Sequence, residues 1–131
     1  MTMIDSQPMP SGELSLQTIA MPRDTNASGD IFGGWLVSQM DLAGAVAACR
    51  VAGGRVATVA IDRMSFMVPV KVGAVVTCYT EITSIGRSSV EVNVEVWVSY
   101  VAGDDELIKV TEGSFIFVSI DDNGRTRVID A

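Results

Sequence analysis

The chain has 131 residues, of which 48% are hydrophobic, and it carries a formal net charge of −7. This length provides one domain with a core of its own, the composition excludes a disordered chain, and the acidic balance disfavours nucleic acid as a partner. Histidine is absent, which excludes Ser-His-Asp and Cys-His catalysis as well as His-based zinc sites, so no metal is expected.

The first twelve residues read as a short disordered leader before a single domain over residues 13–131. They contain neither the basic region nor the apolar stretch of a secretory signal, and no apolar run in the chain reaches the roughly 18–20 residues of a membrane span. Cys49 and Cys78 lie in apolar patterns without CxxC spacing, which favours reduced, buried thiols over a redox role. These features indicate a cytoplasmic protein without a membrane partner.

One long helix is predicted in the first half of the chain. Residues 13–20 alternate and predict a strand, and residues 21–30 have the Pro, Asn, Ser and Gly of a loop. The run from 31 to 49 contains no proline, is apolar nearly all round and is too long for a strand, so it predicts a nearly fully buried helix. Asp30 is a candidate cap before it, and Gly53-Gly54 ends the segment.

From residue 56 onward the pattern is that of strands. They are expected over 56–68, halted at Pro69, and then over 74–85, 90–98, 107–120 and 125–129. Strict alternation in 90–98 indicates one buried and one wet face, Gly103-Asp104-Asp105 turns the chain, and Asn123-Gly124 is a strong hairpin signal.

This layout predicts an α+β fold, with a curved antiparallel sheet of about six strands wrapped around one long central helix. After the helix the strands are expected in meander order. The long edge strands would be exposed in a monomer, so we expect at least a dimer that continues the sheet.

Asp41 is the only charged residue between Phe32 and Cys49. Burying a carboxylate in an apolar helix is costly unless the group is paired or used. The residues on the same helix face are mostly small and leave a slot above the carboxylate. Since histidine is absent, Asp41 is a candidate for acid–base chemistry. The alternative, that it forms a salt bridge with an arginine or caps a neighbouring segment, stays open.

Two further features flank the start of this helix. Gly33-Gly34 could expose backbone N–H groups that polarise a carbonyl oxygen, or could serve close packing against the sheet. Asn26 lies in the preceding loop and is either a functional side chain or a turn former.

Cationic residues in the second half offer candidate anion contacts. Arg87 lies with Ser88 and Ser89 in the short link after Gly86, a combination that could hold a phosphate or an amide but also suits an ordinary hairpin. Arg55 and Arg63 flank a strand near the helix, and each alone fits a solvated surface charge.

Three stretches carry a resemblance to a known family: MPRDTNASGDIFGGWLVSQMDLAGAVAA, GRVATVAIDRMSFMVPVKVGAVV and IGRSSVEVNVEVWV. Together they resemble the YciA-like bacterial acyl-CoA thioesterases, which are hotdog-fold relatives of the brain-type acyl-CoA hydrolases. The resemblance covers residues 14–128. It implies a helix wrapped by a sheet, active sites at a dimer interface and commonly a trimer of dimers.

The resemblance also implies roles for individual residues. Asp41 matches the catalytic aspartate, Asn26 matches an asparagine that faces the partner subunit's aspartate, and Gly33-Gly34 match glycines whose amides bind the thioester oxygen. Arg87 and Ser88 match the segment that contacts coenzyme A. Many relatives continue past the last strand with a polar tail and this sequence stops at Ala131, which puts in doubt the contacts that such a tail supplies to the nucleotide end of coenzyme A.

The expected function is hydrolysis of acyl-CoA to a free carboxylic acid and coenzyme A. Asp41 would act as general base or as nucleophile, Asn26 of the other subunit would orient the water or the substrate, and no cofactor is needed beyond the coenzyme A of the substrate. Two other readings stay open: a non-catalytic module that binds acyl-CoA, and an obligate structural oligomer in which Asp41 only forms a salt bridge.

Overall fold

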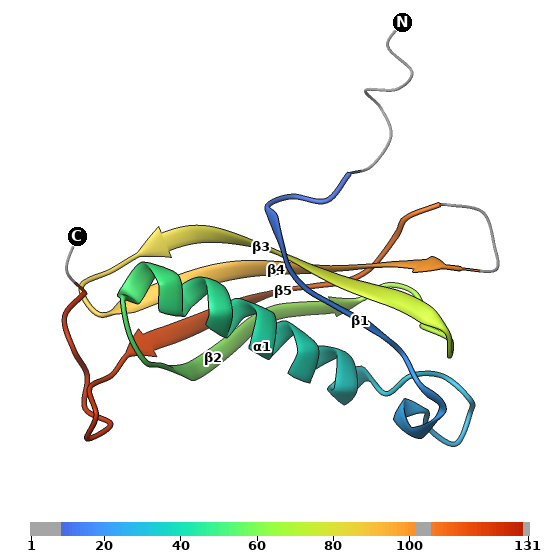
Figure 1. Ribbon diagram of the computed structural model, residues 1–131, viewed down its shortest axis with the longest axis horizontal. Helices are drawn as coiled ribbons and strands as arrows, with labels where there is room; N and C mark the ends of the chain where they lie inside the picture. Colours follow the sequence, from blue (N-terminus) through green and yellow to red (C-terminus); the bar gives the residue numbers. More distant parts are fainter. Residues whose placement is uncertain (1–8, 102–105, 130–131) are drawn as a thin grey trace, which may run out of the picture.

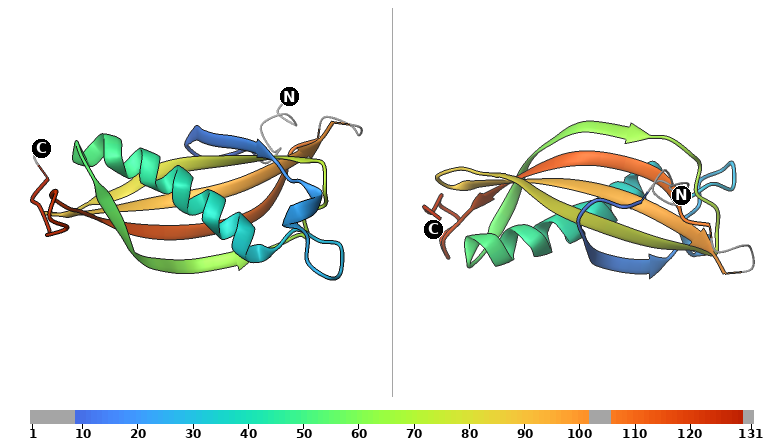
Figure 2. Two further views of the ribbon diagram at one scale, coloured as in Figure 1. Left: turned by 60° about the horizontal axis from the view of Figure 1, so that its bottom comes forward. Right: turned by 90° about the horizontal axis from the view of Figure 1, so that it is seen from above.

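The computed structural model describes residues 9–101 and 106–129. One long helix, α1 (Gly33–Ala52), lies against one face of a five-stranded antiparallel sheet (Figure 1). The strands are β1 (Glu13–Ile19), β2 (Val56–Phe66), β3 (Ala74–Ile85), β4 (Ser89–Tyr100) and β5 (Ile108–Ser119), with a 3-10 turn, η2 (Pro22–Asp24), after β1. Figure 2 shows the sheet curving along the helix. The predicted α+β class, with one central helix and a curved antiparallel sheet, is confirmed.

The strand order differs from a simple meander. It is β1-β3-β4-β5-β2, so β3, β4 and β5 follow one another as expected, whereas β2 lies at the far edge beside β5. The link between β2 and β3 contains Pro69 and crosses the start of β5, where the N–H of Met67 donates to the carbonyl of Val110 at 2.8 Å. The prediction of a full meander is therefore wrong, because this link carries the chain across the sheet instead of folding it back as a hairpin.

The sixth strand predicted over residues 125–129 does not form. The turn before it is present, with Gly124 at φ +79°, but only an isolated bridge joins Ile120 and Thr126. The reason is that β5 already pairs with β4 on one side and β2 on the other. No free edge of β5 is left for a further strand, so the segment contacts β5 only at its last residue, where the N–H of Arg127 donates to the carbonyl of Ser119 at 2.8 Å.

Helix α1 begins two residues later and ends three residues later than predicted. It ends at Gly53, whose φ of +70° stops the helix as expected and whose N–H donates to the carbonyl of Cys49. The side that faces the sheet is buried, and at Gly44 an added Cβ would lie 3.0 Å from the Phe117 ring, so glycine permits this close approach.

The opposite side of α1 is not covered in a single chain. Leu42 and Val46 are 55% and 42% exposed, so the prediction of a nearly fully buried helix is wrong for one protomer. The sheet covers only one side of the helix, and the apolar residues on the other side remain accessible for another molecule.

The alternation in β4 is confirmed on the side facing the helix. Every second residue is fully buried there: Val90, Val92, Val94, Val96 and Val98. The other face is only partly wet. Trp97 is buried and donates its indole N–H to Glu95 Oε1 at 2.8 Å, and the backbone N–H of Ser11 contacts the same oxygen at 3.2 Å. The predicted wet face therefore holds where β4 starts and fails where Glu95 and Trp97 lie.

Two predictions fall partly or wholly outside the described residues. Most of the disordered leader expected over 1–12 and the turn at 103–105 belong to those positions, so both stay predictions. Among the described residues, none of the helices combines the length and the hydropathy that crossing a bilayer requires.

Candidate active site

Asp41 lies near the middle of α1 and is half-buried. Its Oδ1 accepts a hydrogen bond of 2.6 Å from the hydroxyl of Thr58 on β2. Within residues 9–101 and 106–129, no cation lies within 4.0 Å of this carboxylate. The structure therefore does not support the reading in which Asp41 serves as a salt-bridge partner. A carboxylate without a countercharge and with exposed neighbours can accept a proton from a bound molecule.

The first turn of α1 offers unpaired backbone donors. Phe32 occupies the N-cap position without a side-chain cap, and in the described part of the chain the N–H groups of Gly33, Gly34 and Trp35 have no acceptor. A Cβ at Gly33 would lie 3.4 Å from the Phe66 ring, but one at Gly34 would meet nothing within 4 Å. A contact of 3.4 Å is an ordinary van der Waals contact, so close packing requires glycine at neither position, and the amide end at Gly34 is open to a ligand.

Asp30 does not cap the helix as predicted. Its carboxylate forms an ion pair with the ammonium group of Lys71 in the link between β2 and β3. Lys71 is the stronger attraction for this carboxylate because it carries a full charge, whereas the helix end carries about half a charge. The amides at the start of α1 consequently remain free of an internal anion.

A groove of about 290 Å³ opens beside the start of α1. It lies between the first turn of the helix and the end of β2. Most of its walls are apolar, and its lining residues are Asp30, Ile31, Gly33, Leu36 and residues 66–70. The groove can hold an apolar chain next to the open amides.

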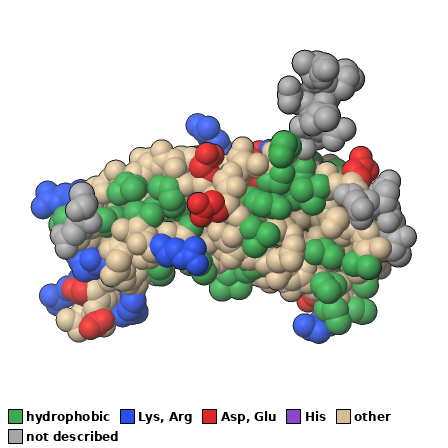
Figure 3. All heavy atoms as spheres, turned by 45° about the horizontal axis from the view of Figure 1, so that its top comes forward, with side chains coloured by type: hydrophobic (Ala, Val, Ile, Leu, Met, Phe, Trp, Pro, Cys, Tyr) green, Lys and Arg blue, Asp and Glu red, His purple; other side chains and the backbone are tan. Residues whose placement is uncertain are grey.

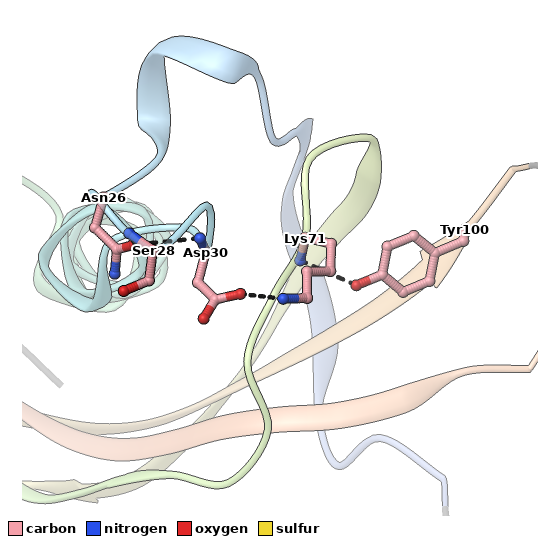
Figure 4. Close-up of polar contacts among 5 residues, drawn as sticks. All are labelled: Asn26, Ser28, Asp30, Lys71 and Tyr100. Carbon is pink, nitrogen blue, oxygen red and sulfur yellow. Dashed lines mark hydrogen bonds and ion pairs between the residues drawn. The ribbon is translucent and has the colours of Figure 1, made fainter.

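Asn26 forms a turn, which is one of the two roles that the sequence left open for it. Its Oδ1 accepts hydrogen bonds from the backbone N–H groups of Ser28 and Asp30 at 2.9 and 3.1 Å. The backbone N–H of Asn26 donates in turn to the carbonyl of Asp30 at 2.7 Å. With its oxygen used in the turn, the NH₂ group has no partner among the described residues and is available as a donor (Figure 4).

The helix amides and Asp41 are separated along α1. Gly34 and Asp41 share a face because seven residues are close to two helical turns, and at 1.5 Å per residue they lie about 10 Å apart along the axis. Both an oxyanion donor and a base have to lie about 3 Å from the reacting atoms. One protomer alone therefore holds these groups too far apart for one compact carbonyl.

Arg55 and Arg87 lie at the end of the sheet where β5 finishes. Arg55 precedes β2 and Arg87 precedes β4, so β5 lies between them. Arg55 is already engaged, since its Nη1 donates to the carbonyls of Asp121 and Asp122 at 3.3 and 3.4 Å. Within the described ranges, the exposed guanidinium of Arg87 has no hydrogen bond or ion pair. Figure 3 shows several basic side chains at one end of the molecule, with acidic side chains among them.

Arg63 is not brought together with these arginines. It lies at an irregular position of β2 with φ +53°, roughly 25 Å further along the strand from Arg55 at about 3.3 Å per residue. Its guanidinium lies 4.0 Å from the carboxylate of the adjacent Asp62 and is largely exposed. Ser88 lies in the tight link after Gly86, and Ser89 begins β4. The carbonyl of Ser88 accepts from the N–H of Ser119, and that of Ser89 accepts from the N–H of Gly86.

Sequence reasoning missed two contacts at these sites. Thr58 lies in an edge strand whose pattern, VATVAI, carries no sign of a partner for Asp41. Arg127 donates to the carbonyl of Ala52 at 2.8 Å and so completes the end of α1. The sequence shows Arg127 shortly after the hairpin signal at Asn123-Gly124, but this is only a weak indication of the second contact. Its partner, Ala52, lies 75 residues earlier in the chain.

Comparison with known proteins agrees with this geometry. The profile of the Thioesterase superfamily matches residues 28–99. The Escherichia coli acyl-CoA thioester hydrolase YciA is 50% identical over 123 residues, covering 92% of this chain and 93% of its own. Of the relatives with solved structures, a hexameric broad specificity acyl-coenzyme A thioesterase, solved with one aspartate replaced by alanine, has a TM-score of 0.90, 52% identity and coverage of 92% of this chain and 88% of its own.

A hexameric hotdog fold thioesterase of Campylobacter jejuni has a TM-score of 0.87 and 40% identity, with 91% of each chain covered. The hotdog fold expected from the resemblance is therefore confirmed. With half of its residues shared with a curated relative along nearly the whole length of both, the chain belongs to the YciA-like acyl-CoA thioester hydrolases of the thioesterase superfamily.

Proposed function

We propose that the protein hydrolyses acyl-CoA thioesters to a carboxylic acid and coenzyme A, with Asp41 as the reacting carboxylate. The observation that carries the proposal is that Asp41 is half-buried in an apolar helix, is held by the Thr58 hydroxyl at 2.6 Å and has no cation near it in the described part of the chain. Such a carboxylate costs desolvation energy, which a chemical role justifies.

The reaction proceeds through attack on the thioester carbonyl. As general base, Asp41 takes a proton from water while the water oxygen bonds to the carbonyl carbon, and the amide N–H groups at Gly33 or Gly34 stabilise the oxyanion. The carbon–sulfur bond then breaks, and coenzyme A leaves as a thiolate that takes up a proton. As nucleophile, Asp41 instead forms a mixed anhydride that water hydrolyses to the same products. Because the thiolate leaves readily, neither route requires histidine or a metal.

The site is proposed to be shared between two protomers. Strand β2 is an edge strand with exposed apolar side chains, of which Val59, Ile61 and Phe66 are 57%, 47% and 53% exposed. Pairing two copies along β2 would cover them and continue the sheet. In that dimer, Asn26 and the helix amides of one subunit complete the site around Asp41 of the other. Relatives described as hexameric support a trimer of such dimers.

Coenzyme A is proposed to extend from Asp41 toward the end of the sheet that carries Arg87. Helix α1 ends at Ala52, three residues before Arg55 at this end of the sheet. Asp41 and Ala52 are eleven residues apart, about 16 Å along the helix, so only an extended ligand spans the distance from Asp41 to this end. Arg87, with Ser88 and Ser89 beside it, is the strongest candidate for a phosphate contact because its guanidinium has no partner among the residues that the structure describes. Arg55 lies at the same end of the sheet as Arg87 and contributes positive charge there. Arg63 is the weakest of the proposed contacts because it lies further along β2, away from this end.

Release of free thiol from several acyl-CoA substrates tests the proposal. The wild-type protein should hydrolyse them, and Asp41→Asn, which keeps the shape of the side chain, should lose about 100-fold or more in kcat. A passive acyl-CoA binding module would bind substrate without turnover, and a purely structural oligomer would do neither. Near wild-type turnover by a folded Asp41→Asn protein would disprove the role of Asp41.

The contact to coenzyme A has a separate test. Replacing Arg87 by alanine should raise KM about tenfold with little change in kcat, because the contact is equally strong in the ground and transition states. A short thioester that lacks the nucleotide serves as the control substrate and should not respond to the change. Equal loss of turnover on both substrates would show that Arg87 has a structural role instead.

A further inference from the structure

We propose that the ion pair between Asp30 and Lys71 is a positioning device for Asn26, which it holds with its NH₂ group turned outward. The proposal rests on the proposed function, in which Asn26 serves the hydrolysis. It assigns a role to two charged residues that take no direct part in the chemistry. The three residues and their contacts are drawn in Figure 4.

The first step concerns the turn that contains Asn26. Both Asn26 oxygens are tied to the backbone of the same loop: Oδ1 accepts from Ser28 and Asp30, and the main-chain carbonyl accepts from Gly29 at 3.0 Å. An amide whose oxygen accepts two N–H groups can present only its NH₂ group to a ligand. The orientation of Asn26 is therefore as well defined as the position of the Asp30 backbone.

The second step concerns what holds Asp30. Its carboxylate pairs with Lys71, and the neighbouring N–H of Ile31 donates to the carbonyl of Val70 at 2.9 Å. Two successive residues of the loop thus contact two successive residues of the link between β2 and β3. Among the described residues, removing the ion pair leaves one hydrogen bond between this loop and the link, although the loop keeps its internal hydrogen bonds, such as that from the Phe32 N–H to the Asp24 carbonyl at 3.0 Å. The loop can then shift as a unit relative to the link.

The third step concerns the anchor of Lys71. Its backbone N–H donates to the hydroxyl oxygen of Tyr100 at 3.1 Å, and its carbonyl accepts from the N–H of Ala74 at 3.2 Å. Tyr100 ends β4 and Ala74 begins β3. Lys71 is therefore fixed to the ends of two inner strands of the sheet, and the ion pair holds the loop that carries Asn26 against this fixed point.

The pair is only partly exposed at its anionic end. The side chain of Asp30 is 29% exposed and that of Lys71 is 62% exposed. A partly exposed pair contributes modestly, so its loss should not unfold the protein. The loss should instead lower kcat, because the rate of the chemical step depends on the position of Asn26.

The test is a double-mutant cycle on the full-length protein with an acyl-CoA substrate. Lys71→Met should lower kcat about fivefold with KM nearly unchanged, the upper range for a partly exposed ion pair. In an Asn26→Ala background the same substitution should have no further effect, because a residue that acts through Asn26 loses its influence with it. Lys71→Arg, which keeps the charge, should restore most of the rate.

Two further variants keep the test decisive. Asp30→Asn removes the same pair from its other side and should reproduce the loss, so it decides the question if Lys71→Met does not fold. Lys109→Met removes an ion pair with Glu112 on the opposite face of the sheet and is the matched control, which should keep the wild-type kcat.

The possible outcomes separate this inference from the proposed function. If the wild type hydrolyses acyl-CoA and Asp41→Asn does not, but Lys71→Met keeps the wild-type kcat, the positioning role is wrong while the function holds. An equal fivefold loss in the presence and absence of Asn26 would also overturn it, since Lys71 would then act independently. If Asp41→Asn remains fully active, the proposed function itself fails.

Discussion

Mixing two inactive variants tests whether the active site is built from two subunits. Asp41→Asn removes the carboxylate and Asn26→Ala removes the proposed partner group, and each alone should lose about 100-fold in turnover. In a dimer with one subunit of each kind, one site receives the intact Asp41 from one chain and the intact Asn26 from the other. The second site of that dimer receives both defects.

The expected magnitude follows from the symmetry of the proposed dimer. Random association of equal amounts gives mixed dimers in about half of the cases, and each has one intact site of two, so roughly a quarter of the wild-type activity should return. The structure supports this design because Gly34 and Asp41 of one chain are about 10 Å apart along α1. Co-expression of the two variants with different affinity tags, followed by a thiol-release assay, measures the recovery.

A matched control uses two defects on the same side of the interface. Thr58 donates to Asp41 within one chain, so mixing Asp41→Asn with Thr58→Val should produce no intact site and only the average of the two parent activities. If the Asp41→Asn and Asn26→Ala mixture also gives no more than the average of its parents, the site lies within a single chain and the reasoning from helix geometry is wrong.

Three further predictions concern single residues. Thr58→Val should lower kcat about fivefold to tenfold through loss of a hydrogen bond to a carboxylate, and Thr58→Ser should restore it in the same thiol-release assay. Burial raises the pKa of the Cys78 thiol to about 12, so iodoacetamide at pH 8 should leave Cys78 unmodified in the native protein and label it after denaturation, as mass spectrometry will show. Burial opposes the charge of Lys109, but two neighbouring glutamates, Glu112 and Glu95, raise its pKa above the usual 10.5. Urea unfolding of the wild type and of Lys109→Met should therefore differ by about 1 kcal/mol in the free energy of unfolding. This difference should be complete below pH 10.5 and disappear as the pH rises through the raised pKa.

Local sequence patterns predicted the elements well because the signals are local. A proline-free apolar run ended by Gly53 defines the helix, and alternation from Val90 to Val98 defines the buried side of β4. Asp41 could be singled out for the same reason, as a charge within an apolar run. Each of these features depends only on residues within a few positions of one another.

The features that could not be predicted depend on distant residues. The position of β2 beside β5 is set by the link across the sheet, and this same neighbour leaves no edge for the expected sixth strand. Asp30 has the position of a helix cap in sequence, yet it pairs with Lys71, 41 residues later. Thr58 becomes the partner of Asp41 only because β2 lies beside the helix. Such contacts follow from strand order, which local patterns do not encode.

The distribution of charge explains how an acidic protein can take an anionic substrate. Three of the carboxylates, Glu81, Glu91 and Glu112, line a groove of about 590 Å³ on the sheet. That groove lies on the side away from α1, since Glu91 alternates with the valines that face the helix. Screening limits the reach of these charges to about 8–10 Å at physiological salt. The proposed binding at Arg87 would therefore depend on the local guanidinium instead of the net charge of −7, and long-range attraction would not accelerate association.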